Sequence, residues 1–355
     1  MQRKKIAVIF GGNSTEHEVS LQSAAAVLWH INREKYEIIP IGITRDGEWY
    51  RYTGKTEHIA DGTWDKDGRY LCPVAISQSR LVRGFLELTD GRYDTVGIDL
   101  AFPVLHGKNG EDGTLQGLFE LAGIPVVGCG TLASALCMDK DRAHKLVSLA
   151  NISVPRSVAF RRMDREAALQ KIAAELVYPL FVKPVRAGSS FGITQVGRKE
   201  ELDDAIELAF EHDTEVIVEE AVDGFEVGCA VMGTDMLTVG RVDEIELSGG
   251  FFDYTEKYTL KSSKIHMPAR ISREAEKRIR KTAATIYRVL GCSGFARVDM
   301  FYTPSGDIVF NEVNTIPGFT AHSRFPNMMD GIGIPFPDML DELIELYLEE
   351  EDEQA

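Results

Sequence analysis

The start of the sequence alternates strand and helix patterns, and this alternation constrains the fold more than any other feature. Lys5–Phe10 is almost continuously apolar, as strands buried on both faces of a parallel sheet are. It leads directly into Gly11-Gly12 and then into a helical pattern from Glu16 to about Asn32. Glu37–Thr44 and Val96–Phe102 predict a second and a third strand. This strand–helix–strand order predicts a parallel sheet within about the first 130 residues.

A second group of predicted elements begins near Val154-Pro155, where the composition changes. Tyr178–Lys183 predicts a strand that Pro184 ends, and the glycine-bounded loop Gly188–Gly192 follows it. Residues 46–94, in the first group, show the patterns of loops and hairpins. Further segments predict strands at Glu215–Glu219, Glu226–Met232, Thr238–Ile245, Phe295–Tyr302 and Asp307–Glu312, and helices at Ser272–Leu290 and Pro337–Glu349. Because 355 residues exceed the usual size of one domain, we expect two or three.

The charge and the cysteines exclude several classes of protein. A net charge of −16 without a basic stripe argues against a nucleic-acid partner, although a local lysine pocket with a metal ion can still hold a nucleotide. The five cysteines are scattered without CxxC spacing, which indicates free thiols rather than a zinc site. No apolar run approaches the roughly 20 residues of a membrane span, and the N-terminus lacks a signal-peptide core. We therefore expect a cytoplasmic protein that does not bind membranes.

Two short segments near the C-terminus place polar residues at alternate positions of predicted strands. Arg297 and Asp299 share one strand face, and Glu312 and Asn314 share another. Carboxylate and amide oxygens are ligands that Mg²⁺ prefers, particularly where it bridges phosphates. Lone carboxylates on strands usually belong to solvated faces, but two such pairs beside apolar residues favour a metal site.

Lysines and a glycine-bounded loop indicate a phosphate site. Lys140 and Lys183 lie at predicted element ends, where their point charges suit phosphate oxygens. The loop Gly188–Gly192 contains Ser189 and Ser190 and can direct backbone N–H groups and hydroxyls at phosphates, although an ordinary β-hairpin turn is the better explanation of this loop when it is considered alone. Together with the carboxylate pairs, these residues predict a metal–nucleotide site.

The chain resembles the D-alanine–D-alanine ligase family of the ATP-grasp superfamily over almost its whole length. The segments that carry this resemblance are GGNSTEHEVSLQSA, FPVLHGKNGEDGTLQGLFELAGIPVVG, ASALCMDKDRAHK, FVKPVRAGSSFGI, EEAVDGFE, FFDYTEKY, GFARVDMF and NEVNTIPGFTAHS.

The resemblance implies an α/β (α+β) fold with three domains: an N-terminal parallel α/β domain (1–136), a central ATP-grasp domain (137–222) and a C-terminal ATP-grasp domain (223–355). It implies that ATP is held between the two antiparallel sheets of the last two domains, together with two Mg²⁺ ions, for which Mn²⁺ is an alternative. It also implies a homodimer that condenses D-alanine with a second D-amino acid through a D-alanyl phosphate, for peptidoglycan precursor synthesis.

The family's functional residues carry over to matching positions of this sequence. Glu16 would take the first substrate's ammonium group and would be linked to Ser189 and Tyr258, while Arg297 and the Gly318 N–H would stabilise the oxyanion of the tetrahedral intermediate. His106 would neighbour the first substrate's carboxylate, and Glu226 would take the ribose hydroxyls. The implied ATP-binding residues are Lys140, Lys183, Ser190, Glu219, Glu220, Val222, Glu226 and Lys257; the implied metal ligands are Asp299, Glu312 and Asn314; and the implied residues beside the second substrate are Ser323 and Arg324.

Arg324 decides the expected second substrate. D-Ala–D-Ala ligases usually carry an apolar residue there, whereas arginine resembles the D-alanine–D-serine ligases of glycopeptide (vancomycin) resistance. Tyr258, in the loop that closes over the site, argues against the lactate-using relatives, which have histidine there. The alternative is that Arg324 points to solvent or to the acidic surface of an ordinary D-Ala–D-Ala ligase. Less favoured alternatives are another ATP-grasp carboxylate–amine ligase and a catalytically silent nucleotide-binding sensor.

Overall fold

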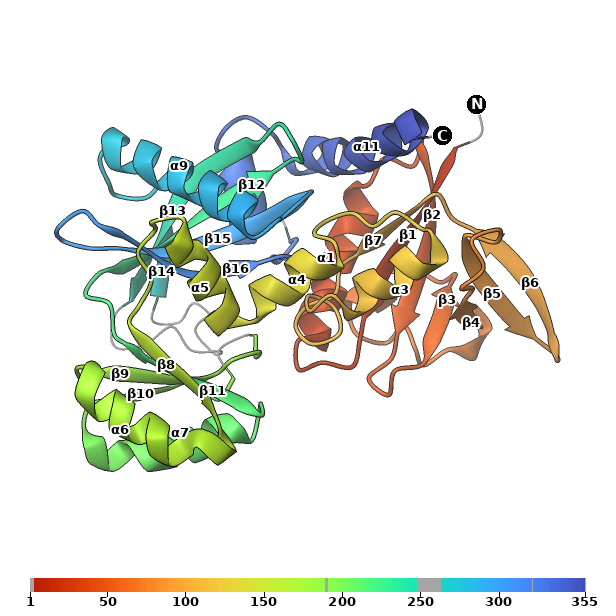
Figure 1. Ribbon diagram of the computed structural model, residues 1–355. Helices are drawn as coiled ribbons and strands as arrows, with labels where there is room; N and C mark the ends of the chain where they lie inside the picture. Colours follow the sequence, from red (N-terminus) through yellow and green to blue (C-terminus); the bar gives the residue numbers. More distant parts are fainter. Residues whose placement is uncertain (1–2, 189–190, 248–262, 321, 355) are drawn as a thin grey trace.

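Three β-sheets organise the chain in the computed structural model, which describes residues 3–188, 191–247, 263–320 and 322–354 (Figure 1). The first sheet has seven strands in the order β6-β5-β4-β3-β2-β1-β7. Its strands are β1 (Lys4–Gly11), β2 (Tyr36–Ile43), β3 (Trp49–Tyr52), β4 (Leu71–Ile76), β5 (Gly84–Thr89), β6 (Arg92–Gly97) and β7 (Leu100–Pro103), and its helices are α1 (His17–His30), α2 (Thr56–Ala60) and α3 (Thr114–Ala122).

The expected parallel sheet forms only part of this first sheet. β1 pairs in parallel with β2 and with β7, whereas β3 to β6 extend the sheet with antiparallel pairs. The prediction of a single strand at Val96–Phe102 is wrong, because β6 ends at Gly97 and β7 begins at Leu100. Between them, Asp99 accepts the Lys5 N–H through Oδ2 over 2.6 Å, which turns the chain back alongside β1. The apolar residues on both sides of this turn concealed it in the sequence.

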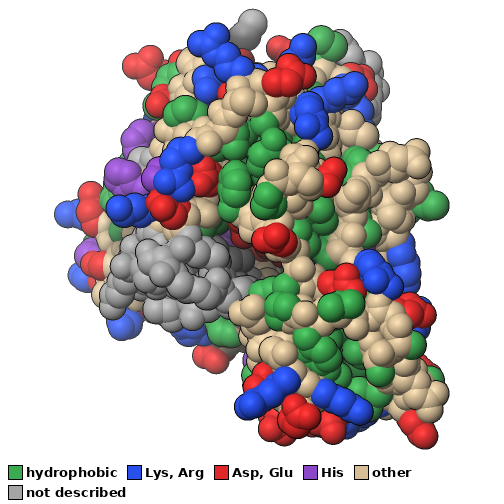
Figure 2. Space-filling model, turned by 90° about the vertical axis from the view of Figure 1, so that its left-hand side faces the viewer, with side chains coloured by type: hydrophobic (Ala, Val, Ile, Leu, Met, Phe, Trp, Pro, Cys, Tyr) green, Lys and Arg blue, Asp and Glu red, His purple; other side chains and the backbone are tan. Residues whose placement is uncertain are grey.

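The second sheet is antiparallel and forms a separate lobe with its own hydrophobic core (Figure 1). Its strands are β8 (Ser157–Arg161), β9 (Leu180–Pro184), β10 (Thr194–Val196) and β11 (Glu215–Glu220), in the order β10-β9-β11-β8, with helices α6 (Arg165–Glu175) and α7 (Leu202–Phe210). Figure 2 shows this lobe below the rest of the molecule, with acidic and basic side chains interspersed at its lower end.

The third sheet is also antiparallel and has the order β14-β13-β12-β15-β16. Its strands are β12 (Phe225–Met232), β13 (Thr238–Leu247), β14 (Ser263–His266), β15 (Phe295–Tyr302) and β16 (Ile308–Asn314), and its helices are α9 (Arg273–Val289), α10 (Arg324–Asp330) and α11 (Phe336–Gln354). Single turns of 3₁₀ helix occur at Gly68–Tyr70, Arg162–Asp164 and Lys199–Glu201. The helix predicted from Ser272 begins at Arg273 because the Ser272 hydroxyl accepts the Ala275 N–H as an N-cap.

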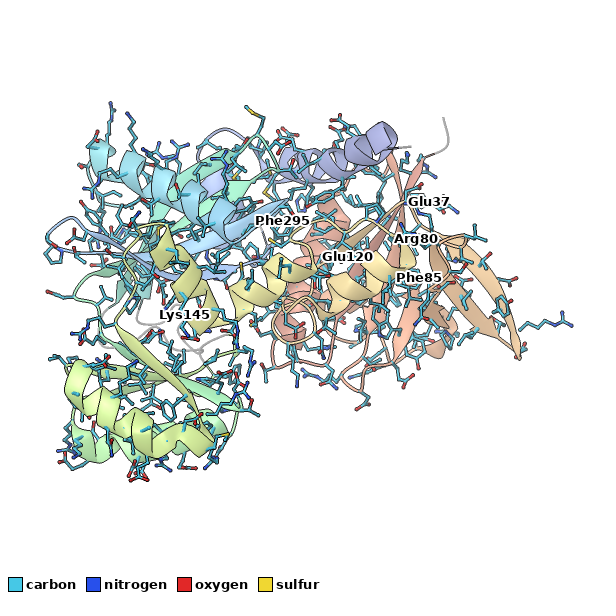
Figure 3. All side chains as sticks on the ribbon, viewed as in Figure 1. Glu37, Arg80, Phe85, Glu120, Lys145 and Phe295 are labelled. Atoms are coloured by element: carbon cyan, nitrogen blue, oxygen red, sulfur yellow. The ribbon has the colours of Figure 1, made fainter. Side chains whose placement is uncertain are left out.

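The first and third sheets are joined by one continuous hydrophobic core. Phe295, labelled in Figure 3, lies on β15 at the junction. Its ring centroid is 6.4 Å from that of Phe102 on β7 and 4.9 Å from that of Phe319. Phe325 stacks on Phe319 at 5.7 Å. Since these rings come from both ends of the chain, they fix the N-terminal domain against the C-terminal sheet.

Each sheet lies within one of the proposed domain ranges 1–136, 137–222 and 223–355. The linking helices α4 (Thr131–Met138) and α5 (Lys140–Leu149) contribute apolar residues to the core of the third sheet rather than to that of the second. No helix among the described residues is both long enough and apolar enough to span a membrane.

Candidate active site

β15 and β16 pair so that the polar residues predicted for metal and transition-state binding form one patch. The register places Asp299 opposite Glu312, and Arg297 opposite Asn314. Asn314 Nδ2 donates to Asp299 Oδ2 over 2.9 Å, and Glu312 Oε2 lies 3.7 Å from Lys140 Nζ. The alternate spacing in the sequence thus becomes a cluster of side-chain oxygens beside Lys140, the lysine that was predicted to bind phosphate.

Arg297 is held in this patch by the carboxylate of its strand neighbour Asp299. Its Nε donates to Asp299 Oδ1 over 2.8 Å and its Nη2 to Oδ2 over 2.6 Å, and both side chains are buried. Burial acts to lower the pKa of Arg297, but Asp299 raises it, and the net pKa lies above the usual value. Arg297 therefore carries a permanent positive charge toward the adjoining cavity.

A cavity of about 570 Å³ lies beside this patch, between the N-terminal domain and the C-terminal sheet. It brings together residues from distant parts of the sequence. The predicted site residues that line it are Glu16, His106, Lys140, Arg297, Glu312, Asn314, Gly318, Ser323 and Arg324.

A second cavity, of about 540 Å³, lies between the two antiparallel sheets. The predicted ATP-binding residues that line it are Lys140, Lys183, Glu219, Glu220, Val222 and Glu226. Lys140 and Glu312 line both cavities, so the two meet at the point where a lysine and a carboxylate approach each other. This arrangement suits a nucleotide whose terminal phosphate reaches toward the first cavity.

Buried charges line this second cavity, which we name the nucleotide cavity after its predicted ligand. Lys183 Nζ donates to Glu219 Oε2 over 2.6 Å, and Glu219 Oε1 lies 3.6 Å from His144 Nδ1. Burial acts to raise the pKa of Glu219, but Lys183 and His144 lower it, and the net pKa is below the usual value. Among the described residues, Glu219 Oε1 accepts no hydrogen bond, which leaves an ionised acceptor for a ligand donor.

Glu16 lies directly before α1 with its carboxylate against two glycines. Gly107 has a φ of 73°, and a Cβ there would overlap Glu16 Oε2, while a Cβ on Gly188 would lie 3.1 Å from the same oxygen. Glycine at both positions is therefore what allows the Glu16 carboxylate to be buried at the cavity wall.

Arg324, at the start of α10, is buried among carboxylates. Its Nε and Nη2 each donate to Asp243 over 2.7 Å, and its Nη1 donates to Glu226 Oε1 over 3.0 Å. Burial acts to lower the pKa of Arg324, but Asp243 and Asp299 raise it well above the usual value. The alternative in which Arg324 points to solvent is therefore wrong: only 9% of its side chain is exposed, and that part lines the first cavity.

The contact between Glu226 and Arg324 was not expected. Glu226 was predicted to take ribose hydroxyls, and it does line the nucleotide cavity, but one of its oxygens also accepts from Arg324. Gly228, on the same strand, donates its N–H to Asp243 Oδ1 over 3.0 Å, and a Cβ there would overlap Arg324 Nη2. The backbone is thus shaped to admit the guanidinium group.

Ser323, the residue directly before α10, lies close to Gly318. The Ser323 hydroxyl oxygen accepts the Thr320 N–H over 3.0 Å, and a Cβ on Gly318 would lie 2.9 Å from that oxygen. Both residues line the cavity with Arg324, as the sequence predicted for residues of one site. The predicted residues Ser189, Ser190, Lys257 and Tyr258 lie outside the described residues, and their roles stay predictions.

Three polar residues of the site were not singled out from the sequence. Asp243 on β13 carried no local signal, because its partner Arg324 is 81 residues away. Glu111 stands within the segment HGKNGEDGTLQG that supported the family resemblance, and Ser23 lies on α1. All three are buried, and Ser23 and Glu111 line the first cavity.

Glu111 gives a test of this buried electrostatic environment. Burial, followed by the charge of Glu16, raises the pKa of Glu111 to about 8. The unfolded carboxyl releases its proton near its ordinary pKa of 4.5, so the folded state keeps a proton that the unfolded state loses. The contribution of the protonated Glu111 carboxyl to the free energy of unfolding is fully present below about pH 4.5 and is lost as the pH rises through about 8.

We therefore expect the free energy of unfolding of the wild-type protein to fall relative to that of Glu111→Gln between pH 5 and 8, by up to about 1.4 kcal/mol per pH unit. The melting temperature of the wild-type protein should fall with it. Thermal unfolding of both proteins at four pH values measures this difference, with Asp307→Asn on the exposed β15–β16 turn as the control. A constant difference at all four values would show that Glu111 titrates normally.

Comparison with known proteins gives consistent results over both halves of the chain. The family described as "D-ala D-ala ligase N-terminus" matches residues 5–129, and that described as "D-ala D-ala ligase C-terminus" matches residues 146–345. The chain is 43% identical over 354 residues to the D-alanine–D-alanine ligase of Caldicellulosiruptor bescii, covering 98% of this chain and 96% of the relative.

A second relative is named for vancomycin resistance, and one similar solved structure is named as a D-Ala:D-Ser ligase. The chain is 47% identical over 354 residues to the vancomycin B-type resistance protein VanB of Enterococcus faecalis, covering 98% of this chain and all of the relative. Among solved structures, the VanG D-Ala:D-Ser ligase of Enterococcus faecalis superimposes with a TM-score of 0.93 at 74% sequence identity, covering 98% of this chain and 100% of that one.

Proposed function

The chain belongs to the D-alanine–D-alanine ligase family, and from this membership we propose that it joins D-alanine to D-serine at the expense of ATP. The observation that carries the choice of D-serine is Arg324, which lines the first cavity and is held in place by the buried carboxylate of Asp243. The similarity to the VanG ligase supports the same choice. The product would be a dipeptide ending in D-serine for peptidoglycan precursor synthesis, and a role in glycopeptide resistance follows as part of the proposal.

The reaction needs ATP because a carboxylate is a poor electrophile. The first D-alanine carboxylate attacks the γ-phosphorus of ATP, ADP leaves, and a D-alanyl phosphate forms. The amine of the second D-amino acid then attacks the acyl carbon, and inorganic phosphate leaves. Phosphoryl transfer depends chiefly on positioning and on charge neutralisation. Lys140 and Lys183 supply the positive charge at the nucleotide cavity.

The residues of the β15–β16 patch fit magnesium. Asp299, Glu312 and Asn314 offer oxygen ligands only, which is the chemistry that Mg²⁺ prefers. No cluster of three or more Asp, Glu, His or Cys side chains able to hold a metal ion occurs in the part of the chain that the structure describes. Such a sparse set suits an ion that completes its coordination with phosphate oxygens and water. Bound there, magnesium neutralises phosphate charge, and we propose two ions, with Mn²⁺ as an alternative.

The oxyanion of the tetrahedral intermediate needs donors aimed at one point. Arg297 and the backbone N–H of Gly318 line the same cavity as Glu16, the proposed partner of the first substrate's ammonium group. Donors held in place before the reaction stabilise the transition state more than the ground state. His106, between them, is buried and uncharged at neutral pH, because burial lowers its pKa.

The Arg324 guanidinium at the cavity wall favours a hydroxymethyl side chain over a methyl group. Three of its five N–H groups donate to carboxylates within the described residues, so the guanidinium has further donors for a substrate. The D-serine hydroxyl can accept from Arg324, whereas a methyl group would bury those donors without compensation. D-alanine as the second substrate is the alternative.

Homodimer formation also stays a proposal, which sedimentation can test.

Phosphate release from ATP tests the function. We expect slow release with D-alanine alone and faster release when D-serine is added, with the mixed dipeptide identified by mass spectrometry. In competition, kcat/KM for D-serine at the second site should exceed that for D-alanine by at least about tenfold. A preference for D-alanine would leave an ordinary D-Ala–D-Ala ligase, and no release with any D-amino acid would contradict the ligase assignment itself.

A further inference from the structure

Residues of the N-terminal domain hold the segment Ile316–Phe319 by its backbone. His106 Nδ1 lies 2.8 Å from the Ile316 carbonyl oxygen, and Ser23 Oγ accepts the Phe319 N–H over 3.2 Å. Glu111 Oε1 accepts the Ile316 N–H over 3.2 Å. Gly318, whose N–H is the proposed oxyanion donor, lies between these anchor points.

The proton positions in this network follow from its chemistry. The Ile316 carbonyl can only accept, so the proton of the neutral His106 ring must be on Nδ1. Nε2 is then an acceptor for the Ser23 hydroxyl, which lies 3.1 Å away. The Ser23 oxygen in turn accepts from Phe319. Each donor therefore has one acceptor: the Phe319 N–H donates to Ser23, Ser23 donates to His106, and His106 donates to the Ile316 carbonyl.

Glu111 adds further hydrogen bonds between the N-terminal domain and this segment. Its second carboxylate oxygen accepts the Gly107 N–H over 2.7 Å, directly after His106. Its backbone carbonyl accepts from the Thr315 hydroxyl over 3.4 Å. The peptide groups before Pro317 and after Gly318 are therefore both fixed from the N-terminal domain, and Pro317 itself restricts the backbone between them.

We propose that Ser23 and Glu111 are positioning residues that aim the Gly318 N–H at the oxyanion, so that the N-terminal domain sets the rate of ligation as well as binding the first substrate. This inference rests on the proposed ligase function. Displacing a reacting group by about 1 Å can lower a rate by about 10²-fold, and losing an oxyanion donor costs about 10²- to 10³-fold. Burial within one continuous core keeps the anchor points rigid.

Ser23→Ala tests the proposal, and Ser20→Ala is its matched control. Both serines are fully buried on α1, but the Ser20 hydroxyl bonds to Gly11 and Val104, which belong to the N-terminal domain itself. We expect Ser23→Ala to lower kcat by about 10- to 100-fold, with KM for ATP and for D-alanine within about twofold of wild type. Ser20→Ala should retain kcat within about threefold.

A tetrahedral phosphinate mimic of the D-Ala–D-Ser adduct gives a more specific readout. Because a mispositioned donor weakens transition-state binding selectively, Ser23→Ala should bind this mimic more weakly by about the same factor as kcat falls, with the affinity for ADP unchanged. Equal kcat losses in Ser23→Ala and Ser20→Ala, or unchanged affinity for the mimic, would overturn the positioning role.

Hydrogen exchange tests the anchoring without any activity. Amides of Ile316 and Phe319 should exchange at least about tenfold faster in Ser23→Ala and in Glu111→Gln than in wild type or Ser20→Ala. Unchanged exchange would overturn the proposal whatever the enzyme's substrates are. If the two variants exchange faster but the wild-type protein ligates no D-amino acids, the proposed function is contradicted and the anchoring stands.

Discussion

Arg324→Met is expected to move the second-substrate preference from D-serine toward D-alanine, changing the ratio of the two kcat/KM values by about 10²-fold. The guanidinium fork is the donor that distinguishes a hydroxymethyl group from a methyl group at the cavity wall. The same change leaves Asp243 buried without its partner, which costs about 3–5 kcal/mol. The ratio is measured by competition between the two D-amino acids, and stability by thermal unfolding.

A second variant separates specificity from stability. In Arg324→Met/Asp243→Asn the buried charge is removed together with its partner, while the asparagine side-chain oxygen can still accept the Gly228 N–H. We expect most of the lost stability to return and the D-alanine preference to remain. If the double variant is stable and still prefers D-serine, Arg324 does not determine the second substrate.

Glu312→Gln is expected to lower kcat by about 10³-fold, equivalent to about 4 kcal/mol of transition-state stabilisation. Glu312 lies opposite Asp299 in the strand register, near Lys140 and at the junction of the two cavities. Glutamine keeps the size of the side chain but removes its charge, which weakens metal binding beside the phosphates. Steady-state kinetics over a range of Mg²⁺ concentrations measures the loss, with partial recovery expected at high Mg²⁺.

Asp307→Asn is the matched control for Glu312→Gln, because it removes a carboxylate from the exposed turn of the same β15–β16 hairpin. Its kcat should stay within about twofold of wild type. Unchanged turnover in Glu312→Gln would rule out Glu312 as a metal ligand that the reaction needs.

The pairing of β15 with β16 shows what could be predicted from the sequence. Alternate residues of a strand share a face whatever the surrounding fold, so Arg297 with Asp299, and Glu312 with Asn314, were predictable as pairs. The same holds for β1, whose apolar run indicated a buried strand. The turn at Asp99 was missed because what defines it is a pair of hydrogen bonds between Asp99 and Lys5, which is remote in sequence.

The family, the main strands of the three sheets and the polar residues that short segments place together could be predicted from the sequence alone, because these follow from local periodicity and from ordered motifs. The burial of Arg324 against Asp243, and the hydrogen bonds by which Ser23, His106 and Glu111 hold the segment before and after Gly318, became visible in the folded structure. Those contacts join residues 81 to 296 positions apart. Such pairs depend on how whole sheets and helices pack, and packing leaves no periodic signal in a single sequence.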